Sequence, residues 1–184
     1  MPGDTPDPER RALITGAWRR PKAAPAVVRP PGARAPDAFA ALCDGCGECA
    51  LACPAEAIAM TGPATEKAEG SPQILALESP CIMCDGLVCS SACPVGALES
   101  ATPESMRIGR VEFHADACLA AQGIDPGCDY CFDRCPLKGR AITYRRGRGP
   151  EIDAAHCTGC GTCVFFCPPL PKALEVLPEA LGNS

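Results

Sequence analysis

Large apolar side chains are scarce in this 184-residue chain. Aromatic residues make up only 4% of it: one Trp, two Tyr and five Phe. The hydrophobic fraction of 47% hides this scarcity because it counts 16 Cys and many Ala. So little bulky apolar material excludes an ordinary hydrophobic core, and domains short of core are usually held together by metals or disulfides.

Long apolar runs are also missing. No stretch approaches the roughly 20 apolar residues that span a bilayer. The pair Arg10–Arg11 is followed by a basic, proline-broken segment, Gly16 to Arg29, rather than by the apolar segment of an export signal. We therefore expect a soluble, cytoplasmic protein with no membrane span. A disulfide framework is disfavoured for the same reason, because it requires export.

Catalytic and nucleotide-binding patterns are absent from the sequence. The only histidines are His114 and His156, and His156 is expected at the surface although it precedes Cys157. No glycine-rich dinucleotide or phosphate loop occurs. The sequence therefore predicts a protein without a substrate site of its own, and not an enzyme.

Only the start of the chain carries a net positive charge. Residues 1–34 contain seven Lys/Arg and three Asp/Glu, whereas residues 35–184 contain ten and nineteen. An acidic body argues against nucleic acid as a partner, since nucleic acid requires a basic surface. It suits a basic face on a redox protein.

The first 36 residues hold eight of the 21 prolines and show no apolar periodicity. We interpret residues 1–36 as an extended basic arm and residues 37–184 as the body. Trp18, the single Trp, is either a free residue of this arm or an anchor for a partner or for the body.

What the sequence has in abundance is cysteine, arranged in four quartets. Each quartet ends in Cys-Pro and is followed within a few residues by Ala-Ile or Ala-Leu. The quartets are Cys43, Cys46, Cys49, Cys53; Cys81, Cys84, Cys89, Cys93; Cys118, Cys128, Cys131, Cys135; and Cys157, Cys160, Cys163, Cys167.

The first and fourth quartets have the spacing C-x2-C-x2-C-x3-C-P, in which three cysteines bind one [4Fe–4S] cluster and the fourth binds a neighbouring cluster. Quartets two and three keep all four cysteines but have enlarged loops. Zinc sites instead show separated Cys pairs with a long spacer. We therefore predict that all 16 cysteines bind four [4Fe–4S] clusters.

Short apolar runs precede several quartets, at Ile74–Leu77, at Val111–Phe113 and at Ile152. The natural unit is therefore a strand, a cluster loop, a short helix and a second strand. The expected fold is α+β and loop-rich: two ferredoxin-like modules, each holding two clusters between short strands and short helices.

The second and third quartets, Cys81–Leu98 and Cys118–Pro136, resemble those of the NapG/MauM-type ferredoxins, and the start of the chain resembles NapF-type proteins. More distantly, the quartet order is similar to that of the electron-transfer subunits of the dimethyl sulfoxide reductase family. The resemblance implies an electron carrier that passes single electrons to or from a partner oxidoreductase such as a molybdenum enzyme. The alternative is a cytoplasmic maturation factor for such an enzyme.

The spacing alone permits either sequential or nested pairing of the quartets. The last resemblance implies nesting, with modules formed by residues 37–72 with 150–184 and by residues 73–149. The four sets are then Cys43, Cys46, Cys49 with Cys167; Cys157, Cys160, Cys163 with Cys53; Cys81, Cys84, Cys89 with Cys135; and Cys118, Cys128, Cys131 with Cys93.

Overall fold

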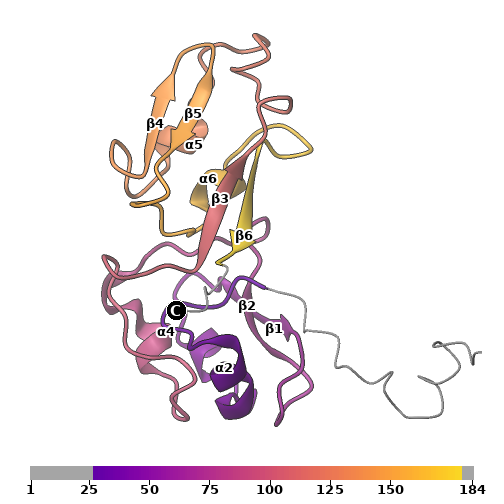
Figure 1. Ribbon diagram of the computed structural model, residues 1–184, viewed down its shortest axis with the longest axis vertical. Helices are drawn as coiled ribbons and strands as arrows, with labels where there is room; N and C mark the ends of the chain where they lie inside the picture. The colour runs from indigo at the N-terminus through magenta and orange to yellow at the C-terminus, as the bar shows by residue number, and fades with distance from the viewer. Residues whose placement is uncertain (1–26, 180–184) are drawn as a thin grey trace, which may run out of the picture.

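The computed structural model describes residues 27–179, which form an elongated body of short helices, short strands and many loops (Figure 1). The expected loop-rich fold with small helices and strands is confirmed. Trp18 and most of the predicted arm lie outside the described residues. Between residues 27 and 179, no helix has the length and apolarity needed to cross a bilayer.

The helices are short because most of them only turn the chain around a cysteine. The longest, α2, begins at Pro36, whose fixed φ suits a first helical position, and buries Phe39. The others are α3 (Glu48–Leu51), the 3-10 turn η1 (Asp85–Leu87), α4 (Val88–Ser91), α5 (Tyr130–Asp133) and α6 (Thr162–Phe165).

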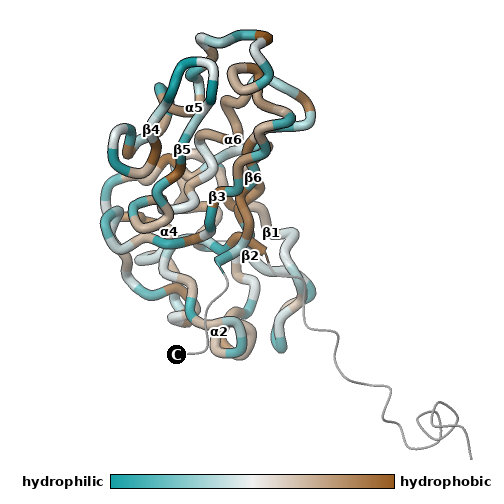
Figure 2. The backbone as a smooth tube through the Cα atoms, turned by 45° about the horizontal axis from the view of Figure 1, so that its top comes forward, coloured by the Kyte–Doolittle hydropathy of each residue, from teal (hydrophilic) through white to brown (hydrophobic). Residues whose placement is uncertain are grey.

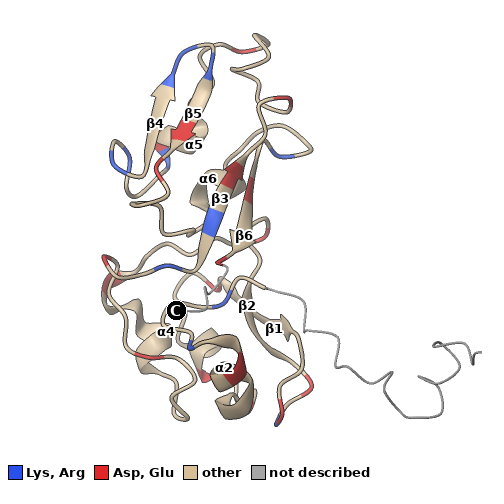
Figure 3. Ribbon diagram, in the orientation of Figure 1, with Lys and Arg blue, Asp and Glu red and all other residues tan. Residues whose placement is uncertain are grey.

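Within residues 27–179, six strands form three antiparallel pairs. The strands are β1 (Ile58–Gly62), β2 (Ser71–Ile74), β3 (Gly109–Phe113), β4 (Ile142–Arg145), β5 (Gly149–Ile152) and β6 (Leu174–Pro178). β1 pairs with β2, β4 with β5, and β3 with β6. The first two pairs are local hairpins, and the basic segment Arg145–Gly149 forms the tip of the β4–β5 hairpin (Figure 3).

Each half of the chain closes on itself. In the C-terminal half, β3 precedes the third quartet and pairs with β6, which follows the fourth. In the N-terminal half, the corresponding contact is a single antiparallel bridge between Ala33 and Leu98. The Glu99 N–H donates to the Gly32 carbonyl beside this bridge, at 2.7 Å.

The segment before α2 belongs to the body, so the predicted arm boundary at residue 36 is wrong. The Val28 carbonyl accepts a hydrogen bond of 2.8 Å from the Ile74 N–H. The Arg29 guanidinium donates to Ser71 Oγ at 2.7 Å and lies 4.4 Å from the centre of the Phe39 ring. These contacts give residues 28–36 partners that their proline-rich composition did not indicate.

Cysteine supplies much of the buried apolar material. The largest fully buried non-proline side chains are few: Phe39, Leu87, Met106, Ile142 and Leu174. Nine of the 16 cysteines are buried, and each hydrophobic cluster of the body contains some of them. In Figure 2, β6 is one of the clearly hydrophobic stretches, at the centre of the molecule. The core is therefore built largely around the cysteine loops.

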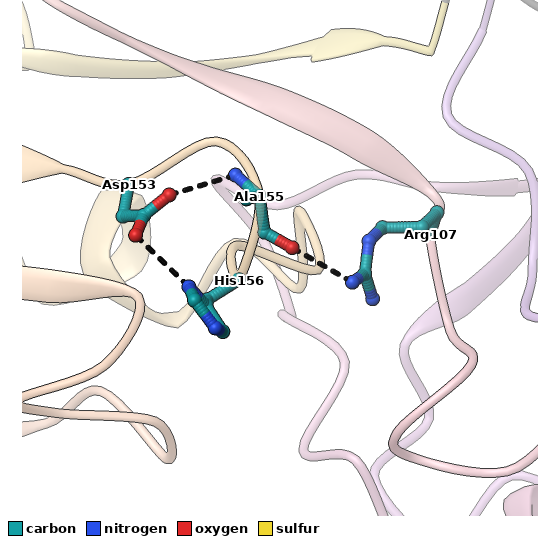
Figure 4. A network of polar contacts seen from close by, with 4 residues as sticks. All are labelled: Arg107, Asp153, Ala155 and His156. Atoms are coloured by element: carbon teal, nitrogen blue, oxygen red, sulfur yellow. Dashed lines mark hydrogen bonds and ion pairs between the residues drawn. The ribbon is translucent and has the colours of Figure 1, made fainter.

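The two halves meet at the second and fourth quartets. The Cys81 N–H donates to the Cys160 carbonyl at 3.0 Å, and the Ile108 N–H donates to the Thr158 carbonyl at 3.0 Å. Next to this junction, Arg107 donates to the Ala155 carbonyl at 2.9 Å (Figure 4). The halves are thus joined at the backbone of two cysteine loops.

Candidate iron–sulfur sites

The 16 cysteines gather around four separate small cavities, each lined by four of them. In each set, three cysteines come from one quartet and the fourth comes from another. Site 1 is Cys43, Cys46, Cys49 and Cys93; site 2 is Cys81, Cys84, Cys89 and Cys53; site 3 is Cys157, Cys160, Cys163 and Cys135; site 4 is Cys118, Cys128, Cys131 and Cys167.

The predicted exchange of the fourth cysteine is therefore present, but the predicted nested partners are wrong. Quartet one exchanges with quartet two, and quartet three with quartet four. The physical reason is that each half closes on itself, through the Ala33–Leu98 bridge in one and through β3–β6 in the other. Helix α3 consequently packs against α4, and α5 against α6. The nested ranges, 37–72 with 150–184 and 73–149, do not describe these groups.

The short helices place the third and fourth cysteines of every quartet. The third lies within a four-residue helix: Cys49 in α3, Cys89 in α4, Cys131 in α5 and Cys163 in α6. The fourth follows two residues after that helix ends. One helical turn thus carries the chain away from its own loop, which is how the C-x3-C spacing serves a neighbouring site.

Two of these helices begin directly after a glycine in the left-handed region. Gly47 has φ of 79° before α3, and Gly161 has φ of 87° before α6. This conformation is open to glycine at little cost. The enlarged loop of quartet two instead uses Leu87, a non-glycine residue with φ of 39°, before α4.

Burial disfavours the charged form of these thiols. It raises the pKa of Cys49 and of Cys81 to about 11, and that of Cys89 and of Cys131 to about 12. Backbone N–H groups oppose this rise at Cys49 and Cys81. A buried thiolate here therefore needs a cation beside it.

The donor set fits an iron–sulfur cluster. All 16 cysteines are free, so none is used in a disulfide. Within residues 27–179, no group of three or more His, Cys, Asp or Glu side chains converges closely enough to hold a single metal ion. Soft thiolates spaced around a cavity, too far apart for one zinc ion, match a multinuclear iron–sulfur centre.

The four sites lie in series. Cys49 of site 1 contributes to the raised pKa of Cys89 in site 2, after the larger effect of burial. Sites 2 and 3 meet at the hydrogen bond from Cys81 to Cys160. Cys131 of site 4 in turn lies near Cys163 of site 3, where burial raises the thiol pKa. The order along the molecule is therefore site 1, site 2, site 3, site 4.

Only one of the cysteines, Cys46 of site 1, is exposed. The Cys46 N–H donates to the Asp44 carboxylate at 3.2 Å, and α3, which begins two residues after Cys46, carries the exposed Leu51. Site 1 is thus the site with a cysteine open to solvent.

Three cations that sequence reasoning missed lie beside the cysteines. Burial raises the pKa of Cys157, and the nearby Arg107 opposes that rise. Arg29 lies close to Cys43, and the ammonium of Lys172 donates to the carbonyl of Cys167. None of the three is adjacent in the sequence to the cysteine that it approaches. The cysteine spacing therefore could not predict the positions of Arg29 and Arg107.

His156 is half-exposed, and its Nδ1 lies 2.9 Å from Asp153 Oδ2 (Figure 4). The other Asp153 oxygen accepts a hydrogen bond from the Ala155 N–H at 2.8 Å. This pair fixes the turn that leads into Cys157, in agreement with the predicted surface position.

A groove of about 650 Å³ lies apart from the four cysteine cavities, between the Ile74–Glu78 segment and β6. Its lining is mainly apolar, with His114, Asp116 and Lys172 among the polar residues. The prediction that the chain has no substrate site stays a prediction.

Comparison with known families agrees with the cysteine chemistry. A family described as "4Fe-4S dicluster domain" matches residues 42–97, and one described as "4Fe-4S binding domain" matches residues 148–169. The first match contains quartets one and two, which also exchange their fourth cysteines in the structure.

Relatives cover most of the chain. The "Methylamine utilization ferredoxin-type protein MauM" of Methylorubrum extorquens is 38% identical over 88% of this chain and 77% of its own length. The "Ferredoxin-type protein NapG" of Escherichia coli is 35% identical over 85% and 72%. The "Ferredoxin-type protein NapF" of the same species is 30% identical over 88% and 91%. The chain therefore belongs to the MauM and NapG family of ferredoxin-type 4Fe–4S proteins.

Proposed function

We propose that this protein is an electron relay carrying four [4Fe–4S] clusters, one at each of sites 1 to 4, in two ferredoxin-like modules. The observation that carries the proposal is that every cysteine belongs to one of four groups of four, each around its own cavity. Once bound, such a cluster accepts and returns a single electron at a potential that the protein sets. The chain's own residues hold the clusters, exclude water and fix their order.

The two modules follow the chain in sequence. Residues 27–101 contribute sites 1 and 2, and residues 108–179 contribute sites 3 and 4. The contact between Cys81 and Cys160 joins the inner site of one module to the inner site of the other. We propose that electrons cross between the modules at this hydrogen bond, so that sites 1 and 4 are the two ends of the relay.

The end at site 1 is the better docking face for a protein partner. Cys46 is exposed there, and Leu51 of α3, the helix that contains Cys49 of the same site, is 81% exposed. Residues 35–106 contain ten Asp/Glu and a single Lys, and Figure 3 shows acidic positions in red on the ribbon of α2 and near β1. The expected partner is therefore an oxidoreductase with a basic face, since complementary charge speeds encounter and fixes orientation. Substrate chemistry belongs to that partner.

The alternative, a maturation factor of the NapF kind acting in the cytoplasm, has weaker support. Identity to NapF is 30%, against 38% to MauM and 35% to NapG. An assembly factor also has no need of four sites in series with one end open to solvent. Neither the cytoplasmic location nor the partner follows from these similarities.

The proposal is tested by counting iron and electrons. Protein purified without oxygen should contain about sixteen iron and sixteen labile sulfide per chain, and should take up about four electrons in a coulometric titration. Values near eight iron and two electrons would refute the four-cluster relay. Binding of an unfolded oxidoreductase, with no change in electron flux when the clusters are lost, would favour the maturation role instead.

A further inference from the structure

The turn after the fourth quartet differs from the other three in which donor forms a hydrogen bond with the carbonyl of the last cysteine. After Cys53, Cys93 and Cys135, that carbonyl accepts a hydrogen bond from the backbone N–H three residues later. The donors are Glu56, Gly96 and Lys138, at 3.1, 3.4 and 3.2 Å. These three turns therefore use only neutral groups.

After Cys167 a charged side chain takes the place of the backbone donor. The sequence Pro168-Pro169-Leu170-Pro171 lengthens this turn, and the Lys172 Nζ donates to the carbonyls of Cys167 and Phe165, the latter at 3.3 Å. Proline has no N–H and fixes φ, which disfavours the compact turn of the other quartets. The proline-rich turn thus holds an ammonium group against the last cysteine of site 4.

The surroundings of the Lys172 ammonium group weaken its electric field only a little. Its partners in the described chain are two carbonyl oxygens, which are neutral, and the Lys172 side chain is half-buried. By contrast, Lys138 after Cys135 is exposed, and its Nζ lies 3.3 Å from Asp133 Oδ1. A carboxylate and solvent both weaken the field of a cation, whereas partial burial preserves it.

We propose that Lys172 is a tuning residue that raises the reduction potential of the cluster at site 4. Reduction adds a negative charge to the site, and a fixed positive charge beside Cys167 stabilises the reduced form more than the oxidised form. Net charge and hydrogen bonding near the sulfurs are established controls of cluster potential. At this end of the relay, Lys172 favours electron arrival.

Lys172 is also joined to site 4 through its own turn. The turn that carries Lys172 also lines the site 4 cavity through Pro168, Pro169 and Ala173. The charge and the cavity are therefore parts of one local structure.

The inference rests on the proposed function and is tested by replacing the charge while keeping the hydrogen bond. Lys172→Gln retains an N–H donor but is neutral, and Lys172→Arg retains the charge. In a potentiometric titration followed by EPR, we expect one of four midpoints to fall in Lys172→Gln by about tenfold in the reduced-to-oxidised ratio, ~59 mV for a one-electron couple. Lys172→Arg should stay near the unchanged protein.

Lys138→Gln is the matched control, because it removes the same charge from the turn after a different quartet. The shifted midpoint should belong to the EPR signal that Cys128→Ala alters. An unchanged midpoint in a fully loaded Lys172→Gln protein would overturn this inference, as would an equal shift in Lys138→Gln or loss of iron from Lys172→Gln alone. About eight iron in the unchanged protein would instead defeat the proposed function itself.

Discussion

The last cysteine of each quartet decides which two quartets share a pair of sites. Cys53, Cys93, Cys135 and Cys167 all leave their own loops, as the C-x3-C-P spacing predicts. The spacing does not specify which other quartet's site receives the fourth cysteine, because the same spacing serves any of them. The grouping of Cys93 with the Cys43 loop comes from the fold of the N-terminal half.

Cysteine substitutions distinguish sequential from nested pairing. Cys93→Ala and Cys43→Ala should alter the same EPR signal, because both residues line site 1. Cys135→Ala should alter a different signal, the one that Cys157→Ala also alters. Iron analysis should accompany each spectrum. A Cys93→Ala spectrum that matched Cys118→Ala would restore the nested arrangement and refute the grouping described above.

At the scale of elements, short segments are held against one another at points where their backbones are in close contact. Gly159, in the loop of quartet four, has φ of 73°, and a Cβ added there would lie 2.1 Å from the Gly109 carbonyl oxygen at the start of β3. Only glycine permits this approach. The start of β3 and the loop of the fourth quartet are therefore in close backbone contact at this point.

Gly159→Ala should destabilise the protein severely. We expect a loss of roughly 4 kcal/mol or more, because backbone overlap adds to the strain of a left-handed alanine. Gly147→Ala is the control: Gly147 has φ of 74° but no atom within 4 Å of an added Cβ, so only the strain of about 1–2 kcal/mol remains. Thermal melts of loaded protein measure both. Equal losses would show that the contact with β3 contributes nothing.

The elements themselves were largely predictable. Apolar residues at Val111–Phe113 and at Ile152 indicated strands that are present as β3 and β5, and the Ala-Leu pair after Cys167 leads into β6. Pairing was not predictable, because five-residue strands such as β3 and β6 carry no partner signal in their sequence. The packing of Arg29 on Phe39 was also missed, since proline-rich composition resembles that of a linker.

At the scale of the whole molecule, the two halves form a single row of sites with one internal junction. Cys81 and Cys160 meet there through a hydrogen bond between backbone atoms. The charge is divided along the same axis. Residues 35–106 are strongly acidic, whereas residues 107–184 contain nine Lys/Arg and nine Asp/Glu. The two ends of the row therefore suit partners of different charge.

Removal of iron should unfold the body. The fully buried large side chains are few, and burial keeps many thiols in an environment hostile to their charged form. The energy of metal binding is therefore folding energy in this protein. Treatment with a chelator and an oxidant should abolish the far-UV circular dichroism signal and the cooperative melt together, and reconstitution should restore both. An unchanged melt in iron-free protein would contradict this expectation.

The exposure of Cys46 determines where inactivation by oxygen begins. Oxidants attack accessible thiolates first, and every other cysteine is at least partly covered. Damage should therefore begin at site 1, before it reaches the other three sites. The protein would lose its link to a partner at one end while most of its iron and its fold persisted, so inactivation by oxygen should precede unfolding.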